Sequence, residues 1–410
     1  MNKIVKYMED GKCVLLNLDN FRFVRVNNEL LKNNDKLMGI LDSKFDFFEM
    51  NKEDDRKTIY YTITKKCNMK CEFCANNSSP YANTEDDINI NTIQNIVIPK
   101  LEKFSIRRLV ISGGEPLLKP DFKELIIQFS KKFSKEKLVL QTNGLLLNEE
   151  QIYFLSDKIS YIEISVENIV ADRKLQEKME HVFENVVAHD IKLVFSFVVT
   201  TQNKSLINSA INLSVKYHAY FELRFVAPLG RAGISPNLIL KEEDILEIYI
   251  DIINYILKHK LFRPELEKIF FFKLAAKNSC GAMGNILAIQ PNGDIYMCPN
   301  LQTKSYYYGN IVQDTYKQIS DMIKEKCEST MIKEKLCVCE RNLCVKCPIK
   351  YFCTGACAAE LDHCELDENR LCNINILFYR FMLFKYTKKQ SMEYNLKLLK
   401  QCIIDYLEKS

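Results

Sequence analysis

Glycine is scarce in this sequence, where it accounts for 12 of 410 residues. Where glycine is rare, each one marks a position at which the backbone turns tightly or approaches a neighbour closely. Long apolar runs are also missing, so no segment reaches the length of a membrane span. The first residues lead into acidic and polar positions, which is not the pattern of a secretory signal peptide. We therefore expect a cytoplasmic protein with no role in a membrane.

A strong charge of either sign is absent too, since the formal net charge is +4 in a sequence of mixed signs. Because no basic patch is interleaved with aromatic residues, we expect no nucleic-acid partner. A hydrophobic share of 47% is typical of a globular protein that buries a full core. A chain of 410 residues suggests two or three domains.

Cysteine, in contrast, is abundant, with 16 residues in clustered spacings that point to metal binding rather than disulfides in the cytoplasm. Cys67, Cys71 and Cys74 follow an apolar, β-branched run at residues 57–64 and have the spacing C-x3-C-x2-C. Three thiolates in one loop can hold a [4Fe–4S] cluster and leave its fourth iron open. A structural zinc site is the alternative that these residues leave open, although zinc normally takes four ligands.

From residue 57 to residue 226 the pattern alternates between strands and helices. The expected strands span residues 57–64, 107–112, 137–142, 160–166, 192–200 and 220–226. The expected helices span residues 88–103, 121–133, 148–155, 173–189 and 204–218. Six successive β/α units predict a parallel sheet covered by helices, with the active site at the carboxyl ends of the strands.

Polar motifs follow consecutive strands of this predicted sheet. Gly113-Gly114-Glu115 follows the second strand, the third strand ends at residues 141–144, and the fourth at residues 165–168. The two glycines allow close backbone approach to a ligand, and the glutamate offers an acceptor for a cationic amine. Each motif alone is ordinary turn chemistry, but together with the cysteine loop they predict one site at the rim of the sheet.

These residues resemble the radical S-adenosylmethionine (SAM) superfamily over roughly residues 57–235, with the signature cysteine spacing and an aromatic, Phe73, before the last cysteine. The resemblance implies a partial (β/α)6 barrel in which SAM chelates the open iron of the cluster. It implies that Gly113, Gly114 and Glu115 hold the methionine amine of SAM. By the same resemblance, the other SAM contacts are Gln141 and Ser165 near the ribose and Arg173 at the carboxylate.

Seven further cysteines resemble the SPASM extension, a C-terminal module that binds auxiliary iron–sulfur clusters in this superfamily. They are Cys280, Cys298, Cys344, Cys347, Cys353, Cys357 and Cys372. Zinc binding by the same thiols is the alternative. The resemblance implies two auxiliary clusters, one fully ligated by Cys344, Cys347, Cys353 and Cys372 and the other held by Cys280, Cys298 and Cys357. The second set lacks a fourth thiol, so its cluster either has an open iron or takes a ligand from elsewhere. The candidates are Cys327, Cys337, Cys339 and Cys364, which are otherwise spare thiols or include one that binds substrate sulfur.

Outside these motifs, residues 224–232 read as a strand closed by a Pro/Gly turn with two arginines, which either pair with local carboxylates or act at the rim. Residues 13–26 predict two strands around a turn at Asp19-Asn20, and residues 28–41 predict a helix. This N-terminal piece either packs on the main domain or grips a peptide by strand addition.

The fold class expected is α/β, with a partial (β/α)6 radical SAM barrel, a Cys-rich C-terminal SPASM domain and a small N-terminal α+β extension. The expected units are residues 1–55 (extension), 56–236 (core), 237–277 (helical bridge), 278–373 (SPASM) and 374–410 (helical tail).

By the resemblance, the protein is an oxidoreductase that cleaves SAM and matures a ribosomally made precursor peptide, through a thioether or another side-chain cross-link. Its partners would be that peptide and an electron donor such as flavodoxin or ferredoxin. One rival is formylglycine formation on sulfatases, against which Pro299 counts, because those relatives have an aspartate after the cysteine equivalent to Cys298. Modification of a small molecule and a non-catalytic zinc-ribbon protein are the other rivals.

Overall fold

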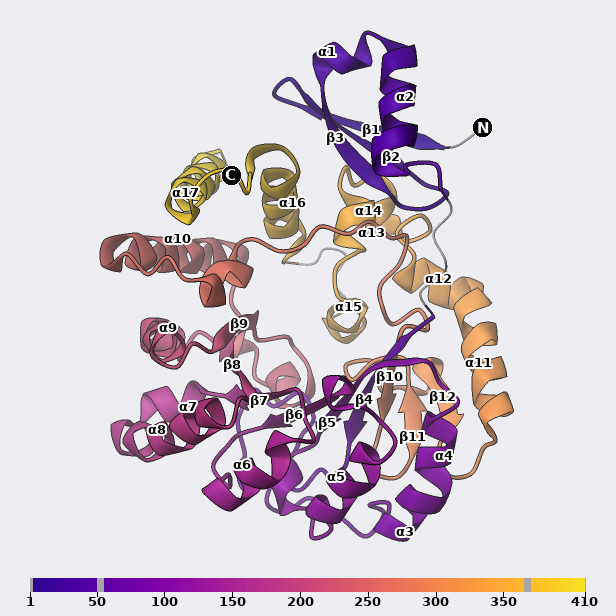
Figure 1. The fold of residues 1–410 in the computed structure, drawn as a ribbon, viewed down its shortest axis with the longest axis vertical. Coiled ribbons are helices and arrows are strands. Elements are labelled where there is room, and N and C mark those ends of the chain that lie inside the picture. Colours follow the sequence, from indigo (N-terminus) through magenta and orange to yellow (C-terminus); the bar gives the residue numbers. More distant parts are fainter. Residues whose placement is uncertain (1–2, 50–54, 365–369, 410) are drawn as a thin grey trace.

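The computed structural model describes residues 3–49, 55–364 and 370–409. The predicted parallel sheet is confirmed (Figure 1), and each of its six strands pairs with the next in chain order. The strands are β4 (Lys57–Thr62), β5 (Ile106–Ser112), β6 (Leu138–Thr142), β7 (Tyr161–Ser165), β8 (Lys192–Val199) and β9 (Tyr220–Phe225). Leu109, Val110 and Ile111 of β5 are all buried, as expected for a strand covered on both faces.

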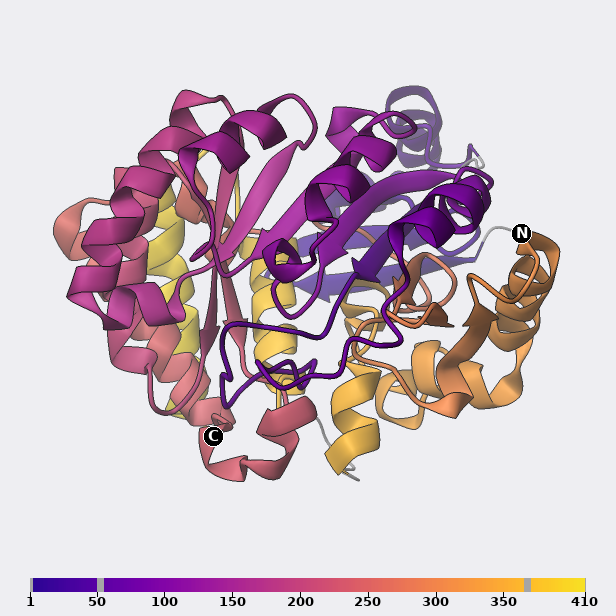
Figure 2. The ribbon, with the colours of Figure 1, turned by 90° about the horizontal axis from the view of Figure 1, so that it is seen from below.

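Helices cover the outer face of this sheet (Figure 2) and hide its apolar side chains from water. They are α3 (Ile90–Thr92), α4 (Ile98–Leu101), α5 (Phe122–Ser130), α6 (Glu149–Ser156), α7 (Glu167–Ala171), α8 (Arg173–Ala188) and α9 (Ile207–Lys216). Side-chain caps fix several starts, because Asn148 accepts from the amide of Gln151 and Asp172 accepts from that of Leu175. The short helix α7 was not predicted.

The helix predicted at residues 88–103 is interrupted by a π-helical turn, Ile93–Val97. The amide of Ile98 donates to the carbonyl of Ile93, five residues back. Pro99, in the next turn, has no N–H to continue the α-helical ladder, which accounts for the change of hydrogen-bond register here.

Three strands that were not predicted extend the sheet beyond β4. They are β10 (Ile286–Ile289), β11 (Asp294–Tyr296) and β12 (Tyr307–Asn310). β10 pairs in parallel with β4, while β11 and β12 follow antiparallel, so one nine-stranded sheet runs from β12 to β9. The segment expected to be a separate cysteine-rich unit therefore begins on the same sheet as the core.

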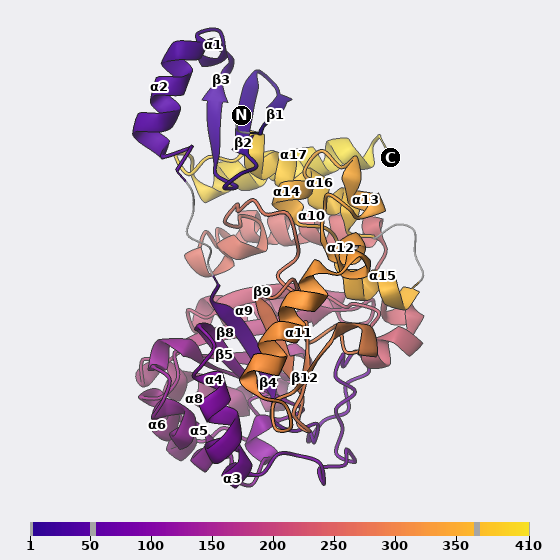
Figure 3. The ribbon, with the colours of Figure 1, turned by 90° about the vertical axis from the view of Figure 1, so that its right-hand side faces the viewer.

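Helices dominate the rest of the C-terminal half (Figure 3), as the sequence predicted for the bridge and the tail. They are α10 (Glu242–His259), α11 (Tyr316–Glu328), α12 (Thr330–Leu336), α13 (Asn342–Val345), α14 (Lys350–Cys353), α15 (Ala358–Cys364), α16 (Cys372–Arg380) and α17 (Met392–Leu407). Every helix in the described residues is too short or too polar to cross a lipid bilayer.

The N-terminal extension is a three-stranded antiparallel sheet, β1 (Ile4–Glu9), β2 (Lys12–Asn17) and β3 (Phe23–Asn27), followed by α1 (Asn28–Leu31) and α2 (Asn34–Phe45). The predicted strand pair is present as β2 and β3, whereas β1 was not predicted. The predicted helix at residues 28–41 is divided into α1 and α2. Residues 50–54, at the end of the expected extension, lie outside the described residues.

One face of this N-terminal sheet covers the loop that carries the later cysteines. Val14 and Leu16 of β2 share a buried cluster with Cys344. Phe352, which directly precedes Cys353, packs against two rings of the sheet, with centroids 5.6 Å from Tyr7 and 5.0 Å from Phe23. The extension therefore packs on the cysteine-rich region, whereas the first of the two alternatives given above had it pack on the main domain.

Truncation of this anchor should loosen the extension. Phe352 is 2% exposed, so we expect Phe352→Ala to cost about 3–5 kcal/mol of stability through lost burial and a residual cavity. The measurement is thermal unfolding followed by circular dichroism. The control is Tyr153→Ala, which truncates a ring that is 70% exposed and should leave the melting temperature nearly unchanged. Equal melting temperatures for the two variants would contradict the packing described here.

Candidate active site

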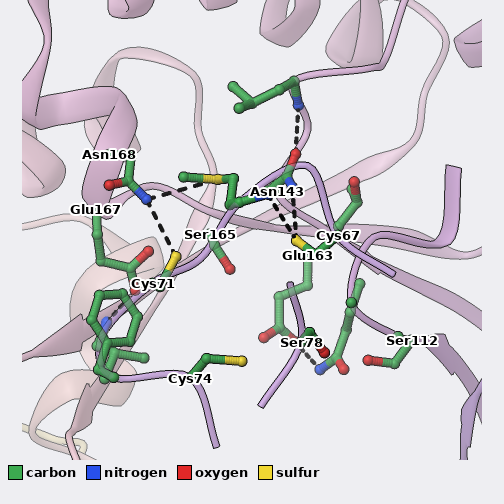
Figure 4. Close-up of a pocket in the computed structure, with 18 of the residues that line it drawn as sticks. Cys67, Cys71, Cys74, Ser78, Ser112, Asn143, Glu163, Ser165, Glu167 and Asn168 are labelled. Atoms are coloured by element: carbon green, nitrogen blue, oxygen red, sulfur yellow. Dashed lines mark hydrogen bonds between the residues drawn. The ribbon is translucent and has the colours of Figure 1, made fainter. Parts of the chain in front are cut away.

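The loop after β4 brings three thiols to one cavity at the carboxyl ends of the parallel strands. Cys67, Cys71 and Cys74 all line this cavity, whose volume is about 210 Å³ (Figure 4). Backbone bonds shape the loop, because the amide of Cys67 donates to Ser79 (3.1 Å) and that of Cys74 donates to the carbonyl of Cys71 (3.2 Å). The three thiols therefore face a common space, as the spacing predicted.

The Gly113-Gly114 turn after β5 supports this loop from below. The amide of Gly114 donates to the carbonyl of Thr64 at 2.8 Å, and the amide of Glu115 donates to that of Lys66 at 2.8 Å. A Cβ atom at Gly114 would lie 2.3 Å from the carbonyl oxygen of Lys66, and one at Gly113 would lie 2.7 Å from that of Thr64. Both positions therefore require glycine so that the cysteine loop can pass directly over the turn.

The segment after β9 holds the same loop from the opposite side. Arg231 donates from Nε to the carbonyl of Cys71 (2.7 Å) and from Nη2 to that of Ser78 (2.8 Å), and its amide donates to Cys74 (3.1 Å). Gly230 has φ +56°, and a Cβ there would lie 2.4 Å from the carbonyl oxygen of Ala75. The cysteine loop is thus bound both by the turn after β5 and by the segment after β9, the last strand of the arc. The sequence analysis named this segment but did not assign the arginine to the loop.

Hydrogen-bond donors surround two of the thiols. The amide of Met69 donates to Sγ of Cys67 at 3.4 Å, and the side-chain amide of Asn143 lies 3.9 Å from the same sulfur. Asn168 donates to Sγ of Cys71 at 3.8 Å. Such donors stabilise thiolate ligands and tune the potential of a bound metal group. Both asparagines lie in the predicted rim motifs, although the analysis singled out other residues there.

Burial raises the pKa of the Cys67 and Cys71 thiols above the ordinary value. Without a metal these two groups therefore keep their protons more tightly than a free cysteine. Metal binding needs thiolates, so it would release those protons.

The carboxylate of Glu115 is engaged by the fold rather than turned into the cavity. Glu115 is fully buried and accepts from the Thr142 hydroxyl (2.8 Å), the Asn143 amide (2.8 Å) and the Leu117 amide (3.1 Å). It is not among the residues that line the cavity, whereas Gly113 and Gly114 are. Through these hydrogen bonds, the Glu115 side chain connects the turn after β5 to the end of β6.

Gln141 and Ser165 both line the cavity, as expected. The amide of Gln141 donates to Oε2 of Glu163 at 3.1 Å. The other oxygen of Glu163 accepts from Arg224 at 2.7 Å. Of the two arginines after β9, Arg224 therefore pairs with a carboxylate and Arg231 binds backbone carbonyls.

Arg173 is not brought to the cavity. Its side chain is 91% exposed and pairs with Glu177 on the same helix, with an Nε to Oε1 distance of 3.0 Å. The expectation that Arg173 binds the SAM carboxylate gains no support from this position, since α8 carries the residue outward.

Glu167 is a cavity residue to which the sequence analysis gave no role. It is 5% exposed, and burial raises its pKa to about 7 even though its carboxylate accepts from the amide of Val198 at 2.5 Å. It lies within residues 165–168 at the end of the fourth predicted strand, and this place in a rim motif was the available signal.

A second group of thiols lines another cavity, of about 560 Å³, beside α13 and α14. Its members are Cys344, Cys347, Cys353 and Cys372, the four that were expected together. Burial, with the neighbouring thiols of this group, raises the pKa of Cys353 to about 12.

The remaining expected set also comes together. Burial raises the pKa of Cys298 to about 12, and the nearby thiols of Cys280 and Cys357 contribute to the increase. Cys357 follows Cys353 by four residues, so one short segment links the two thiol groups.

Two of the candidates for a fourth thiol lie beside tyrosine hydroxyls. Cys327 is next to the Tyr308 hydroxyl (3.7 Å), and Cys339 is next to that of Tyr351 (3.3 Å). The backbone of Cys337 pairs with that of Ser279, but its thiol neighbours are Glu340 and Cys339. The side chain of Cys364 lies outside the described residues.

The three thiols of the cysteine loop fit an iron–sulfur cluster with one open iron in their number, their common cavity, their N–H donors and the glycine turn beside them. Within the described ranges, no three Cys, His, Asp or Glu side chains converge closely enough to hold a single metal ion.

Comparison with known proteins gives a consistent picture. Residues 61–194 match the sequence profile of the Radical SAM superfamily. Among curated proteins, mycofactocin maturase MftC of Mycobacterium tuberculosis is 24% identical over 276 residues, which span 62% of this chain and 68% of MftC.

Two solved structures share the fold over most of the chain. SuiB of Streptococcus suis bound to S-adenosylmethionine has a TM-score of 0.54 at 15% identity. The alignment covers 90% of this chain and 96% of the SuiB chain. SuiB has also been solved with the precursor peptide SuiA, with a TM-score of 0.52. The protein anSMEcpe with bound AdoMet and Cp18Cys peptide has a TM-score of 0.57 at 20% identity and covers 85% of this chain and 99% of its own.

Replacement of Arg231 should disturb metal loading of the cysteine loop. A lysine cannot bridge two carbonyls as the planar guanidinium does, and each charge-assisted bond contributes about 1.5–3 kcal/mol. We expect both Arg231→Lys and Gly230→Ala to lower the iron bound after anaerobic reconstitution, measured with a colorimetric iron assay. The matched control is Arg173→Lys, at an exposed arginine away from the cavity. Iron content as low in this control as in Arg231→Lys would contradict the assignment.

Proposed function

Because residues 61–194 of this chain form a radical SAM domain, we propose that the protein is an oxidoreductase that cleaves S-adenosylmethionine and modifies a ribosomally made peptide. The modification proposed is a thioether or another side-chain cross-link. The single observation that carries the first part is the convergence of Cys67, Cys71 and Cys74 on one cavity beside a glycine turn. When bound, the cluster and SAM supply a one-electron reductant and a hydrogen-abstracting radical.

The residues of this chain have separate tasks in such a reaction. Gly113 and Gly114, which line the cavity, would hold the methionine part of SAM, and Gln141 and Ser165, which also line it, would contact the ribose. Arg231 and the glycine turns keep the loop in register, and the side-chain amides of Asn143 and Asn168 donate to the ligand sulfurs. In place of Arg173, the cavity offers the guanidinium groups of Arg224 and Arg231.

We assign the two further thiol groups to auxiliary iron–sulfur clusters. Cys344, Cys347, Cys353 and Cys372 would complete one, and Cys280, Cys298 and Cys357 would hold another. A substrate radical that closes a thioether loses one electron while the substrate thiol loses its proton. The auxiliary groups are where that electron would go, and an external flavodoxin or ferredoxin would exchange electrons with the enzyme.

A peptide substrate is supported by the relatives and by the N-terminal sheet. MftC is named a maturase, and SuiB has been solved with a precursor peptide. In the described residues, β1 and β3 are the edges of the three-stranded sheet and pair with no further strand. An open edge can add a strand from an extended peptide, with backbone hydrogen bonds supplying affinity. The extension can therefore grip a peptide while it also packs on the cysteine-rich region.

Anaerobic reconstitution separates the proposal from a zinc-ribbon protein. We expect about eleven to twelve irons per chain and SAM cleavage under a strong reductant. Colourless protein that holds stoichiometric zinc and cleaves no SAM would overturn the proposal. If a short cysteine-rich open reading frame lies next to this gene, its product is the first peptide to assay as a substrate.

Cys67→Ala should abolish SAM cleavage, because the loop loses one of three ligands. The readout is methionine released under reducing conditions, measured by mass spectrometry. Cys402→Ala serves as the control, since Cys402 lies on α17 and belongs to neither thiol group. Full cleavage by Cys67→Ala would rule out the assignment of the cluster.

Cys344→Ala should behave differently, because it removes a ligand from an auxiliary site and leaves the first cavity intact. We expect residual uncoupled SAM cleavage without modified peptide, which follows from blocked electron removal. Quantifying methionine and cross-linked peptide in the same reaction checks this. An unchanged ratio of the two products would show that this thiol group is dispensable.

A further inference from the structure

A buried arginine lies beside the thiols assigned to the auxiliary clusters, and no carboxylate among the described residues pairs with it. Arg341 is 6% exposed and occupies the N-cap position of α13, the helix that carries Cys344. Its amide donates to the carbonyl of Cys337 at 2.9 Å, and its carbonyl accepts from the amide of Cys344 at 2.8 Å. The backbone thus fixes the arginine next to a proposed cluster ligand.

The side chain of Arg341 is only partly satisfied. Nη1 donates to the carbonyl of Ala356 at 2.5 Å, while Nη2 is buried and has no hydrogen-bond partner among the described residues. No carboxylate in the described part of the chain forms an ion pair with it. Asp362, which lines a neighbouring cavity with it, is bound by Lys335 (3.0 Å) and by the hydroxyl of Tyr306.

A buried cation without a counter-charge is costly unless something not yet counted carries the negative charge. The two other acidic residues that line the same cavity, Glu334 and Glu340, also make no ion pair with Arg341. No carboxylate among the described residues therefore supplies the balancing charge, and the thiols beside the guanidinium are the candidates.

The guanidinium lies close to the thiol of Cys344, and its positive charge acts on that thiol. A Cβ built at Gly355 would be 2.9 Å from Nη1 of Arg341 and 3.5 Å from Sγ of Cys344. Ala356, whose carbonyl holds Nη1, directly precedes Cys357 of the other thiol group. The positive charge therefore stands where the chain passes from one proposed cluster to the next.

We propose that Arg341 balances the negative charge of the auxiliary cluster on Cys344, Cys347, Cys353 and Cys372 and thereby raises its reduction potential; this inference rests on the cluster assignment made above. A reduced cluster carries one more negative charge than an oxidised one, so a nearby fixed cation stabilises the reduced form. A higher potential makes the cluster a better acceptor for the electron that leaves the substrate. Arginine suits the position because it stays protonated when buried, whereas a lysine readily loses its proton there.

The test is a redox titration followed by electron paramagnetic resonance on the full-length, anaerobically reconstituted protein. Cys67, Cys71 and Cys74 are replaced by alanine in every sample, so that only auxiliary clusters contribute. The signal of the relevant cluster is identified by its loss in Cys347→Ala. Iron content and the spectrum of this parent protein report separately on the cluster assignment. If no cluster forms on these thiols, the assignment and the inference both fall; if it forms, the titration tests Arg341 alone.

Arg341→Gln is compared with Lys346→Gln, which removes an exposed charge that lines the cavity of the same four thiols. We expect Arg341→Gln to change the ratio of oxidised to reduced cluster about tenfold at a fixed potential, which corresponds to a potential about 59 mV lower for one electron. Lys346→Gln should change that ratio less than twofold, because solvent screens its charge. Equal shifts in the two variants, or none in Arg341→Gln, would overturn the proposal.

Arg341→Lys provides a second measurement that does not depend on loading of the glutamine variant. With lysine in place, the potential should equal that of the parent at low pH and fall as pH rises, because the buried amine loses its proton. The parent potential should not show this additional fall. A potential that follows the parent at every pH would contradict the role of the charge.

Discussion

The structure depends on one constraint, the position of the loop that carries Cys67, Cys71 and Cys74. Two sets of hydrogen bonds to the backbone of the loop hold it from opposite sides. The Gly113-Gly114 turn lies directly beneath the start of the loop, and Arg231 binds its carbonyls from beyond β9. Because the first contact comes from β5 and the second from β9, the loop is fixed only when the six-stranded arc is complete. Metal-binding geometry is therefore a property of the whole barrel.

The second organising feature is the position of the N-terminal sheet over the cysteine-rich region. Tyr7 and Phe23 pack on Phe352, the residue before Cys353, so the same small sheet has one face on the auxiliary thiols and two edges open to a further strand. A peptide held at such an edge would lie on the element that shields a proposed cluster. On the proposed function, peptide binding and electron acceptance would therefore take place in neighbouring parts of the molecule.

The sequence alone predicted the six core strands and grouped the cysteines correctly, because β-branched runs and thiol spacings are local signals. It missed β10–β12, because β10 joins the sheet only by pairing with β4, more than 200 residues earlier in the chain, and β11 and β12 then pair in turn next to β10. The sequence alone also did not predict that Glu115 accepts hydrogen bonds from Thr142 and Asn143, because these bonds depend on tertiary contacts. Arg173 shows the same limit, because the direction of a side chain on α8 depends on how that helix packs.

The central claim is that SAM binds to the open iron of a cluster on the cysteine loop. The most direct test is electron–nuclear double resonance on the reduced full-length protein mixed with SAM that carries ¹⁵N in its amine. The account predicts a hyperfine coupling between this nitrogen and the reduced cluster. A reduced cluster that gives a clear signal but no coupling to labelled SAM would contradict the account.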